Sequence, residues 1–169
     1  MQALRRIVVG IDYFTEKTGS LLAWLCLALA VITCLVVLLR YGFGIGSVAG
    51  QESITYMHAT LFMLAAAFTL KRDGHVRVDI FYRRFSPRGR AWVNAVGSIV
   101  FLLPLCVFII AVSWQFVTEA WAIREGSADP SGIHAVFLLK SLIPMMAALL
   151  LLQAVAELLR STITLVDGD

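Results

Sequence analysis

Residues 91–117 read AWVNAVGSIVFLLPLCVFIIAVSWQFV, a run of 27 positions without a charged side chain. An α-helix rises about 1.5 Å per residue, so roughly 20 apolar residues cross a hydrocarbon core about 30 Å thick. Lipid offers no hydrogen-bond partners to a peptide backbone, and a helix satisfies its own backbone groups. The run therefore predicts a membrane-spanning helix.

Three further apolar segments show the same pattern. Residues 21–39 and 54–70 carry no charged side chain, and residues 133–159 carry only Lys140 and Glu157. The alternation of apolar and polar residues that is typical of membrane β-barrels is missing. The sequence predicts an all-α membrane protein with one membrane domain, whose four transmembrane helices lie at about residues 20–40, 53–71, 90–117 and 133–160.

The composition excludes a soluble enzyme. Hydrophobic residues make up 60% of the chain and charged residues only 15%, and the mean hydropathy is +0.86. An ordinary soluble domain is roughly half apolar and about a quarter charged. Cys26, Cys34 and Cys106 all lie in apolar runs and form no CxxC motif, so we expect apolar side chains there and neither disulfides nor metal ligands.

Two amphipathic stretches are predicted to form helices on the membrane surface. At about residues 4–17, apolar side chains share one helical face, while Arg5, Asp12 and Glu16 lie on the opposite face. The alternative for this segment is a frayed tail. A second interfacial helix is predicted at about residues 77–85, where apolar residues recur at i, i+3, i+4 and i+7: Val78, Phe81, Tyr82 and Phe85.

Glycine, serine and proline mark the expected helix ends. Gly74 is expected to break the helix of the second span. Ser86 and Pro87 are expected to start the third helix, because a hydroxyl caps the first free N–H groups and proline lacks an N–H. Pro104 and Pro144 lie inside helical runs and predict local kinks.

The distribution of positive charge predicts the orientation. The N-terminal segment, the connection between the second and third spans and the C-terminal tail hold eleven of the 14 Lys and Arg residues. The two loops on the other side hold only Arg40 and Arg124. The positive-inside rule therefore places both termini in the cytoplasm. The basic charge is expected to face anionic membrane lipid and not nucleic acid.

The sequence predicts no catalytic, cofactor-binding or metal-ligating residue. Proton relays and antiporters place carboxylates inside their spans, and a membrane haem protein needs paired histidines at membrane depth. Here Glu52 and Glu157 lie at span ends, and His58 is the only histidine within a span. We expect the His58 ring to be hydrogen-bonded within a helix interface, with contact to a ligand as the alternative.

The ends of the spans carry a family pattern. Arg40-Tyr41 ends the first span, Glu52 opens the second, and residues 71–79 follow it with the sequence KRDGHVRVD. Together with the four spans, this pattern resembles the small membrane subunit, of the DctQ type, of tripartite ATP-independent periplasmic (TRAP) transporters. Residues 129–160 resemble one branch of that family.

The resemblance implies a sodium-driven uptake system of three parts in the bacterial inner membrane. A periplasmic binding protein captures an organic anion such as a dicarboxylate, sialic acid or 2-oxo acid, and a large membrane subunit moves it. The small, non-catalytic subunit scaffolds the large one and helps to dock the binding protein. The structural or interface candidates are Arg40, Tyr41, Glu52, His75, Asp79, Lys140, Pro144 and Gln153.

Two other classes of protein stay open. A stand-alone small transporter is disfavoured because no carboxylate lies inside the spans. An assembly or anchor subunit of a respiratory membrane complex is disfavoured because paired histidines are missing.

Two expectations concern the side of the membrane opposite the termini. Glu52 is expected to pair with Arg40, with Lys140 or with a base on the large subunit, since a carboxylate at a bilayer edge is tolerated best when paired. The alternative is that the side chains of Arg40, Glu52 and Lys140 all point to water. The loop between the last two helices is expected to dock the binding protein. The alternative is that Trp121 only anchors its helix among the lipid headgroups. The docking candidates are Glu119, Trp121, Arg124, Glu125 and Asp129.

Overall fold

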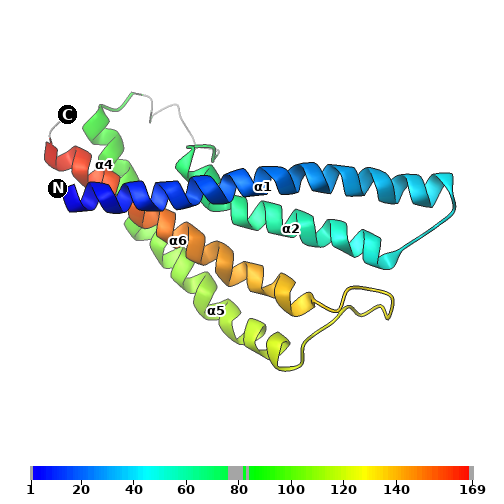
Figure 1. The fold of residues 1–169 in the computed structure, drawn as a ribbon. Helices are drawn as coiled ribbons and strands as arrows, with labels where there is room; N and C mark the ends of the chain where they lie inside the picture. The colour runs from blue at the N-terminus through cyan, green and yellow to red at the C-terminus, as the bar shows by residue number, and fades with distance from the viewer. Residues whose placement is uncertain (1, 76–81, 83, 168–169) are drawn as a thin grey trace.

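The computed structural model describes residues 2–75, 82 and 84–167, and all its regular elements are helical (Figure 1). The helices are α1 (Gln2–Gly42), α2 (Val48–Lys71), α4 (Pro87–Gly97), α5 (Leu103–Ala122) and α6 (Val136–Asp167), with a π-helical turn, η1 (Ser98–Leu102), between α4 and α5. Four helical runs are long and apolar enough to cross a membrane: α1, α2, the run Pro87–Ala122 and α6. The predicted all-α membrane fold is confirmed.

The first helix is longer than its predicted span. Residues 4–17 are helical, but they continue without a break into the span predicted at 20–40, so the expected separate surface helix is the first part of α1. At about 1.5 Å per residue, the 41 residues of α1 extend over about 60 Å, roughly twice the hydrocarbon thickness. The second predicted surface helix, at 77–85, lies mostly outside the described residues.

Serine caps start two of the helices. The Ser86 hydroxyl accepts the N–H of Gly89 at 3.2 Å, and Pro87 occupies the first turn, which confirms the predicted start of the third helical run. The Ser47 hydroxyl accepts the N–H of Gly50 at 3.1 Å, so α2 begins five residues before its predicted start. In both cases the side chain satisfies a backbone donor that has no partner within the helix.

The helix of the second span ends near Gly74, as expected, but Gly74 is not the residue with the left-handed backbone angles that end it. The last turn of α2 closes with the N–H of Gly74 on the carbonyl of Thr69 (2.9 Å) and the N–H of Asp73 on that of Leu70 (3.1 Å). This is the Schellman arrangement, in which one residue adopts left-handed backbone angles. Here that residue is Asp73, with φ of 56°, and not the glycine.

The predicted kink at Pro104 corresponds to the π-helical turn directly before it. The N–H of Leu103 donates to the carbonyl of Ser98, five residues back. Proline lacks an N–H and its ring clashes with the carbonyl four residues back, so the α-helical ladder cannot continue unchanged at this point. At Pro144, in contrast, α6 remains helical on both sides.

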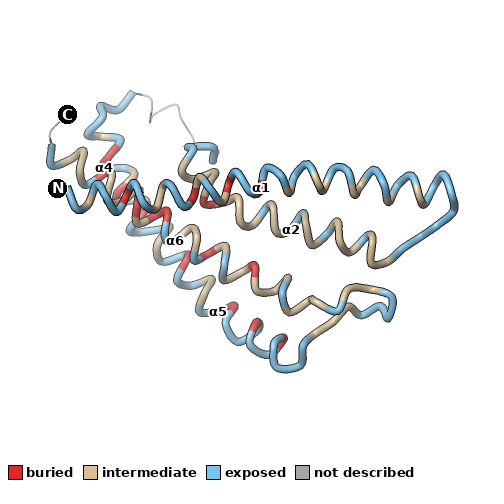
Figure 2. The backbone as a smooth tube through the Cα atoms, viewed as in Figure 1, coloured by how far each residue is buried: buried red, intermediate tan, exposed pale blue. Residues whose placement is uncertain are grey.

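The helices form a row with α6 at its centre. α6 packs against α1, α2, α4 and α5, and α1 also packs against α2. In Figure 1 the α1–α2 hairpin and the α5–α6 hairpin diverge toward the end opposite the two termini. Figure 2 shows most buried positions along α6 and near the terminal end, whereas the far half of α1 is largely exposed and that of α2 is mostly intermediate. We call the end with the termini the terminal end and the other the loop end.

Small residues allow the close packing. Ala147, Ala154 and Ala156 on α6 are completely buried. A Cβ atom on Gly19 of α1 would lie only 2.2 Å from the ring of Phe68 on α2. Membrane helices rely on such small residues because lipid provides no hydrophobic force that drives helices together.

Candidate functional site

A carboxylate joins α2 to the loop at the other hairpin. The Glu52 carboxylate accepts the N–H of Ile133 at 2.6 Å and also the hydroxyl of Ser127. Glu52 lies in the first turns of α2, and both donors lie in the loop between α5 and α6, residues 123–135. We call these contacts of Glu52, Ser127 and Ile133 the loop clasp. It bridges the loop ends of the two diverging hairpins.

The clasped loop has a defined backbone. The N–H of Ser127 donates to the carbonyl of Ile133 at 3.2 Å, and the N–H of Ser131 to the carboxylate of Asp129 at 2.8 Å. A Cβ atom on Gly132 would lie 2.3 Å from the Ser127 hydroxyl and 2.6 Å from the Glu52 carboxylate. Only glycine therefore fits between the carboxylate and the loop at this position.

The expected pairing of Glu52 with Arg40 or Lys140 is corrected by these contacts. Lys140 donates to the Glu125 carboxylate at 2.5 Å, and its ammonium lies 4.0 Å from the centre of the Phe116 ring. The Arg40 guanidinium lies over the neighbouring Tyr41 ring at 5.9 Å. The prediction searched for positively charged partners. It missed the actual ones because a backbone N–H and a serine hydroxyl are uncharged donors.

The docking candidates gather at the loop end. Trp121 donates its indole N–H to the hydroxyl of Ser141 at 2.8 Å, and its ring packs edge-on against Phe137 at 4.7 Å. Glu119 is exposed and accepts the side-chain amide of Gln115, one turn back on α5. Trp121 therefore fastens α5 to α6 while its ring stays half exposed, at 48%.

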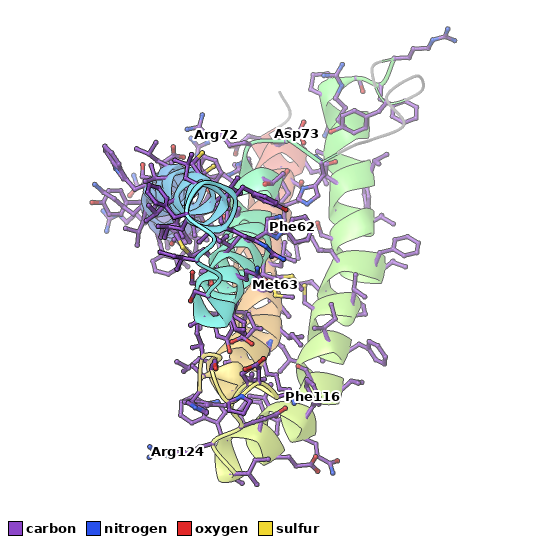
Figure 3. All side chains as sticks on the ribbon, turned by 90° about the vertical axis from the view of Figure 1, so that its right-hand side faces the viewer. Phe62, Met63, Arg72, Asp73, Phe116 and Arg124 are labelled. Atoms are coloured by element: carbon purple, nitrogen blue, oxygen red, sulfur yellow. The ribbon has the colours of Figure 1, made fainter. Side chains whose placement is uncertain are left out.

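Arg124 ends α5 through its backbone. The N–H of Glu125 donates to the carbonyl of Ala120 (2.9 Å) and that of Arg124 to the carbonyl of Trp121 (3.2 Å), with φ of 46° at Arg124. This is a second Schellman ending, again without glycine at the left-handed position. Figure 3 shows Arg124 and Phe116 at the loop end, far from Arg72 and Asp73 at the terminal end.

A second polar cluster ties α1 to α6 at the terminal end. Gln153 of α6 is completely buried; its amide accepts the Thr15 hydroxyl at 2.8 Å and donates to the Asp12 carboxylate at 3.2 Å. Arg160 donates to Asp12 at 2.7 Å and also pairs with Glu157. We call these five residues the terminal network.

The terminal network extends to the neighbouring helices. Asn94 of α4 donates to Glu157 at 3.3 Å. On the other side, Lys71 of α2 donates to the Glu16 carboxylate at 2.6 Å and to the carbonyl of Asp12 at 2.8 Å, and Arg72 also pairs with Glu16. The network thus connects α1, α2, α4 and α6 at one end of the helices.

Sequence reasoning placed Asp12 and Glu16 on the polar face of a surface helix, but the structure places them against α6 and α2. The signal that could have found this contact is charge: these acidic residues, Lys71 and Arg160 were all predicted at the same membrane face. Of the other candidates, Gln153 is the buried centre of the network, Pro144 lies inside α6, and Tyr41 and His75 are exposed. Asp79 lies outside the described residues.

The geometry of the described residues connects helices. Across residues 2–75, 82 and 84–167, no group of three or more His, Cys, Asp or Glu side chains could hold a metal ion. The ion pairs of this part of the chain lie at the terminal end, apart from Lys140–Glu125 at the loop end. Such an arrangement fixes helices relative to one another at both ends of the row.

Comparisons with known proteins agree with this architecture. The family model for the DctQ component of tripartite ATP-independent periplasmic transporters matches residues 29–164. A Haemophilus influenzae protein described as a TRAP transporter small permease protein is 30% identical over 126 residues, covering 73% of this chain and 78% of that protein. The Vibrio cholerae C4-dicarboxylate TRAP transporter small permease protein DctQ is 26% identical over 117 residues, covering 66% of this chain and 50% of that protein. No solved structure matches the chain.

Proposed function

The chain belongs to the DctQ family, the small permease subunits of TRAP transporters, and we propose that it acts as the scaffold for the large membrane subunit of a sodium-driven uptake system for an organic anion. Members of this family are transporter subunits and not enzymes. The chain is a multi-pass protein with four helices that can cross the inner membrane.

The observation that carries the scaffold role is the placement of the ion pairs. A transporter moves a polar substrate and coupling ions past polar groups near the middle of the membrane. Here the described ion pairs lie at the two ends of the helices, where they fasten helices to each other. Between these ends the helices expose many large apolar side chains, which suits packing against a second membrane protein.

Reconstitution tests this role. Proteoliposomes would hold this chain alone, or this chain with the large membrane subunit of its host, each supplied with the binding protein and a sodium gradient. A panel of radiolabelled dicarboxylates, sialic acid and 2-oxo acids serves as substrate. We expect uptake only in the second preparation. Uptake by this chain alone would contradict the scaffold role and support a stand-alone transporter.

The loop end is the proposed docking surface for the periplasmic binding protein. The loop clasp and the Trp121–Ser141 bond hold residues 119–133 on rigid helix ends, and Glu119 and Asp129 there are exposed. Delivery of substrate requires release, so the contact is transient, and weak complexes rely on small polar interfaces and electrostatic steering. The competing role for Trp121 is a headgroup anchor.

The orientation follows from charge and topology together. Both termini lie at the same end of the molecule, as Figure 1 shows, and that end holds most Lys and Arg residues. The positive-inside rule places this end in the cytoplasm and the loop end in the periplasm. The substrate class is supported by the Vibrio cholerae relative, whose name assigns it to C4-dicarboxylate transport.

A further inference from the structure

The second helix has an open groove along one face. The groove has a volume of about 460 Å³ and runs along α2 from His58 past Ala65 and Ala66 to Thr69, with His75 beyond the end of the helix and Met146 of α6 also lining it. α2 packs against both α1 and α6, yet Ala67 is its only buried residue among those described. In Figure 3, Phe62 of this groove lies between the labelled residues of the two ends, in the middle of the molecule.

The groove contains an exposed imidazole at membrane depth. His58 lies six residues after Glu52 and 13 before Lys71, or about 9 Å and 20 Å along the helix. Its ring stacks on that of Phe62, at 6.4 Å and 7°. Within the described residues no hydrogen bond reaches the His58 ring, so the expected bond inside this chain's own helix interface is not formed.

Three threonines of the same helix satisfy their hydroxyls locally, whereas the buried Tyr56 hydroxyl has no partner within the described residues. The hydroxyls of Thr55, Thr60 and Thr69 donate to the carbonyls four residues back, at 3.4, 2.8 and 3.0 Å. Within the described residues no such bond is present at His58, and a polar group left unpaired in hydrocarbon costs several kcal/mol by general transfer measurements. Intramembrane histidines accordingly face protein or water and not lipid.

We propose that a transmembrane helix of the large subunit packs into this groove on α2 and supplies the hydrogen-bond partner of His58. The inference rests on the proposed function and specifies which face of the small subunit is covered. Ala65 and Ala66 form a small-residue surface on which a partner backbone can approach closely, and the imidazole fixes the position of that partner along α2. A lipid chain would fill the groove but would leave the imidazole unpaired.

Photo-cross-linking tests the occupant. Benzoylphenylalanine would replace Phe62 in the groove or, as a matched control, Trp24 on α1; the two side chains are equally exposed, at 74% and 72%. In membranes that contain the large subunit, we expect a cross-link to that subunit from position 62 and little from position 24. Co-purification of the tagged chain with the large subunit is measured in the same samples.

His58 variants test the polar contact. With limiting large subunit, His58→Leu should lower the yield of the cross-link from position 62 by about three- to tenfold, because one interhelical hydrogen bond is lost. His58→Gln, which keeps a donor and an acceptor, should retain most of the yield. His58→Leu makes the span more apolar, so membrane insertion is preserved.

The outcomes separate the groove from the scaffold role. Co-purification without a cross-link from position 62, equal yields from both positions, or a cross-link to a second copy of this chain would overturn the groove proposal and leave the scaffold role standing. Equal yields with His58→Leu and His58→Gln would overturn the polar contact. Loss of co-purification in the unmodified chain would overturn both proposals.

Discussion

Glu52 has a structural role that its charge alone does not reveal. Its carboxylate accepts one backbone N–H and one hydroxyl from a loop about 80 residues away in the sequence. Hydrogen bonds to an ionised group are stronger than bonds between neutral groups, so a single side chain can hold a loop in place. The sequence marked Glu52 as a candidate but named Arg40 or Lys140 as its partner within the chain, whereas Lys140 pairs with Glu125.

We expect Glu52→Gln to loosen the loop clasp. The amide oxygen can still accept the N–H of Ile133 and the NH₂ group can donate to the Ser127 hydroxyl, but both bonds lose the strength that an ionised carboxylate gives them. Amide hydrogen exchange of residues 127–133 should become several-fold faster, as measured by mass spectrometry. Glu119→Gln is the matched control, since Glu119 contacts only its own helix through Gln115 in the described structure. Unchanged exchange in Glu52→Gln would show that the clasp does not order the loop.

The left-handed backbone conformation of Arg124 can be tested separately from its side chain. A left-handed residue with a Cβ costs about 1–2 kcal/mol, and glycine avoids much of this strain. With φ of 46° at this position, Arg124→Gly should be more stable than Arg124→Ala by about 1 kcal/mol, because both variants lose the same side chain. Thermal unfolding in detergent measures the difference. Equal stability of the two variants would contradict the assigned backbone conformation.

The membrane-spanning helices were predictable because the length of an uncharged apolar run shows directly whether a helix can cross the bilayer. The four spans, the cap at Ser86 and the distortion near Pro104 all follow from local sequence. The terminal network was not predictable in the same way, since it depends on where Asp12 meets Arg160 and Gln153, far apart in the chain. An amphipathic pattern shows that residues 4–17 have a polar face, but not whether water or another helix meets it.

The α1–α2 contact should depend on the missing side chain at Gly19. An added Cβ would collide with the Phe68 ring, and overpacking of this kind costs about 1–3 kcal/mol, against a gain of up to about 1 kcal/mol in helix propensity. Gly19→Ala should therefore be neutral to destabilising in thermal unfolding. Gly10→Ala is the matched control on the same helix, because nothing lies within 4 Å of its added Cβ, and it should be stabilising. If both variants gained stability equally, the close packing at Gly19 would be refuted.

The arrangement of the row explains why one chain of this kind needs partners. α6 packs against four other helices, whereas the far half of α1, the turn η1 and α5 expose large apolar side chains such as Trp24, Phe101 and Phe108. Lipid can cover those faces. The exposed His58 and the charged loop end are different, because each presents polar groups for which we propose partners outside the chain.

Electrostatic steering at the loop end should be visible in transport. Removing charge while keeping hydrogen bonds, with Glu119→Gln and Asp129→Asn together, should lower the rate of uptake that depends on the binding protein by about two- to fivefold at low ionic strength. The difference from the unmodified complex should shrink as potassium chloride is raised, because salt screens exposed charges. Asp167→Asn, at the terminal end, is the control and should leave the salt dependence unchanged. An unaltered salt profile in the double variant would argue against docking at this loop.

The scaffold role is tested most directly by the composition of the particle that contains this chain in its host membrane. The tagged chain would be extracted in mild detergent and its intact mass measured by native mass spectrometry, followed by identification of the bound subunits. We predict a stable complex with the large membrane subunit of the transporter, held through apolar helix faces that this chain leaves open on its own. A particle that contains only this chain, and that transports substrate after reconstitution, would contradict the account.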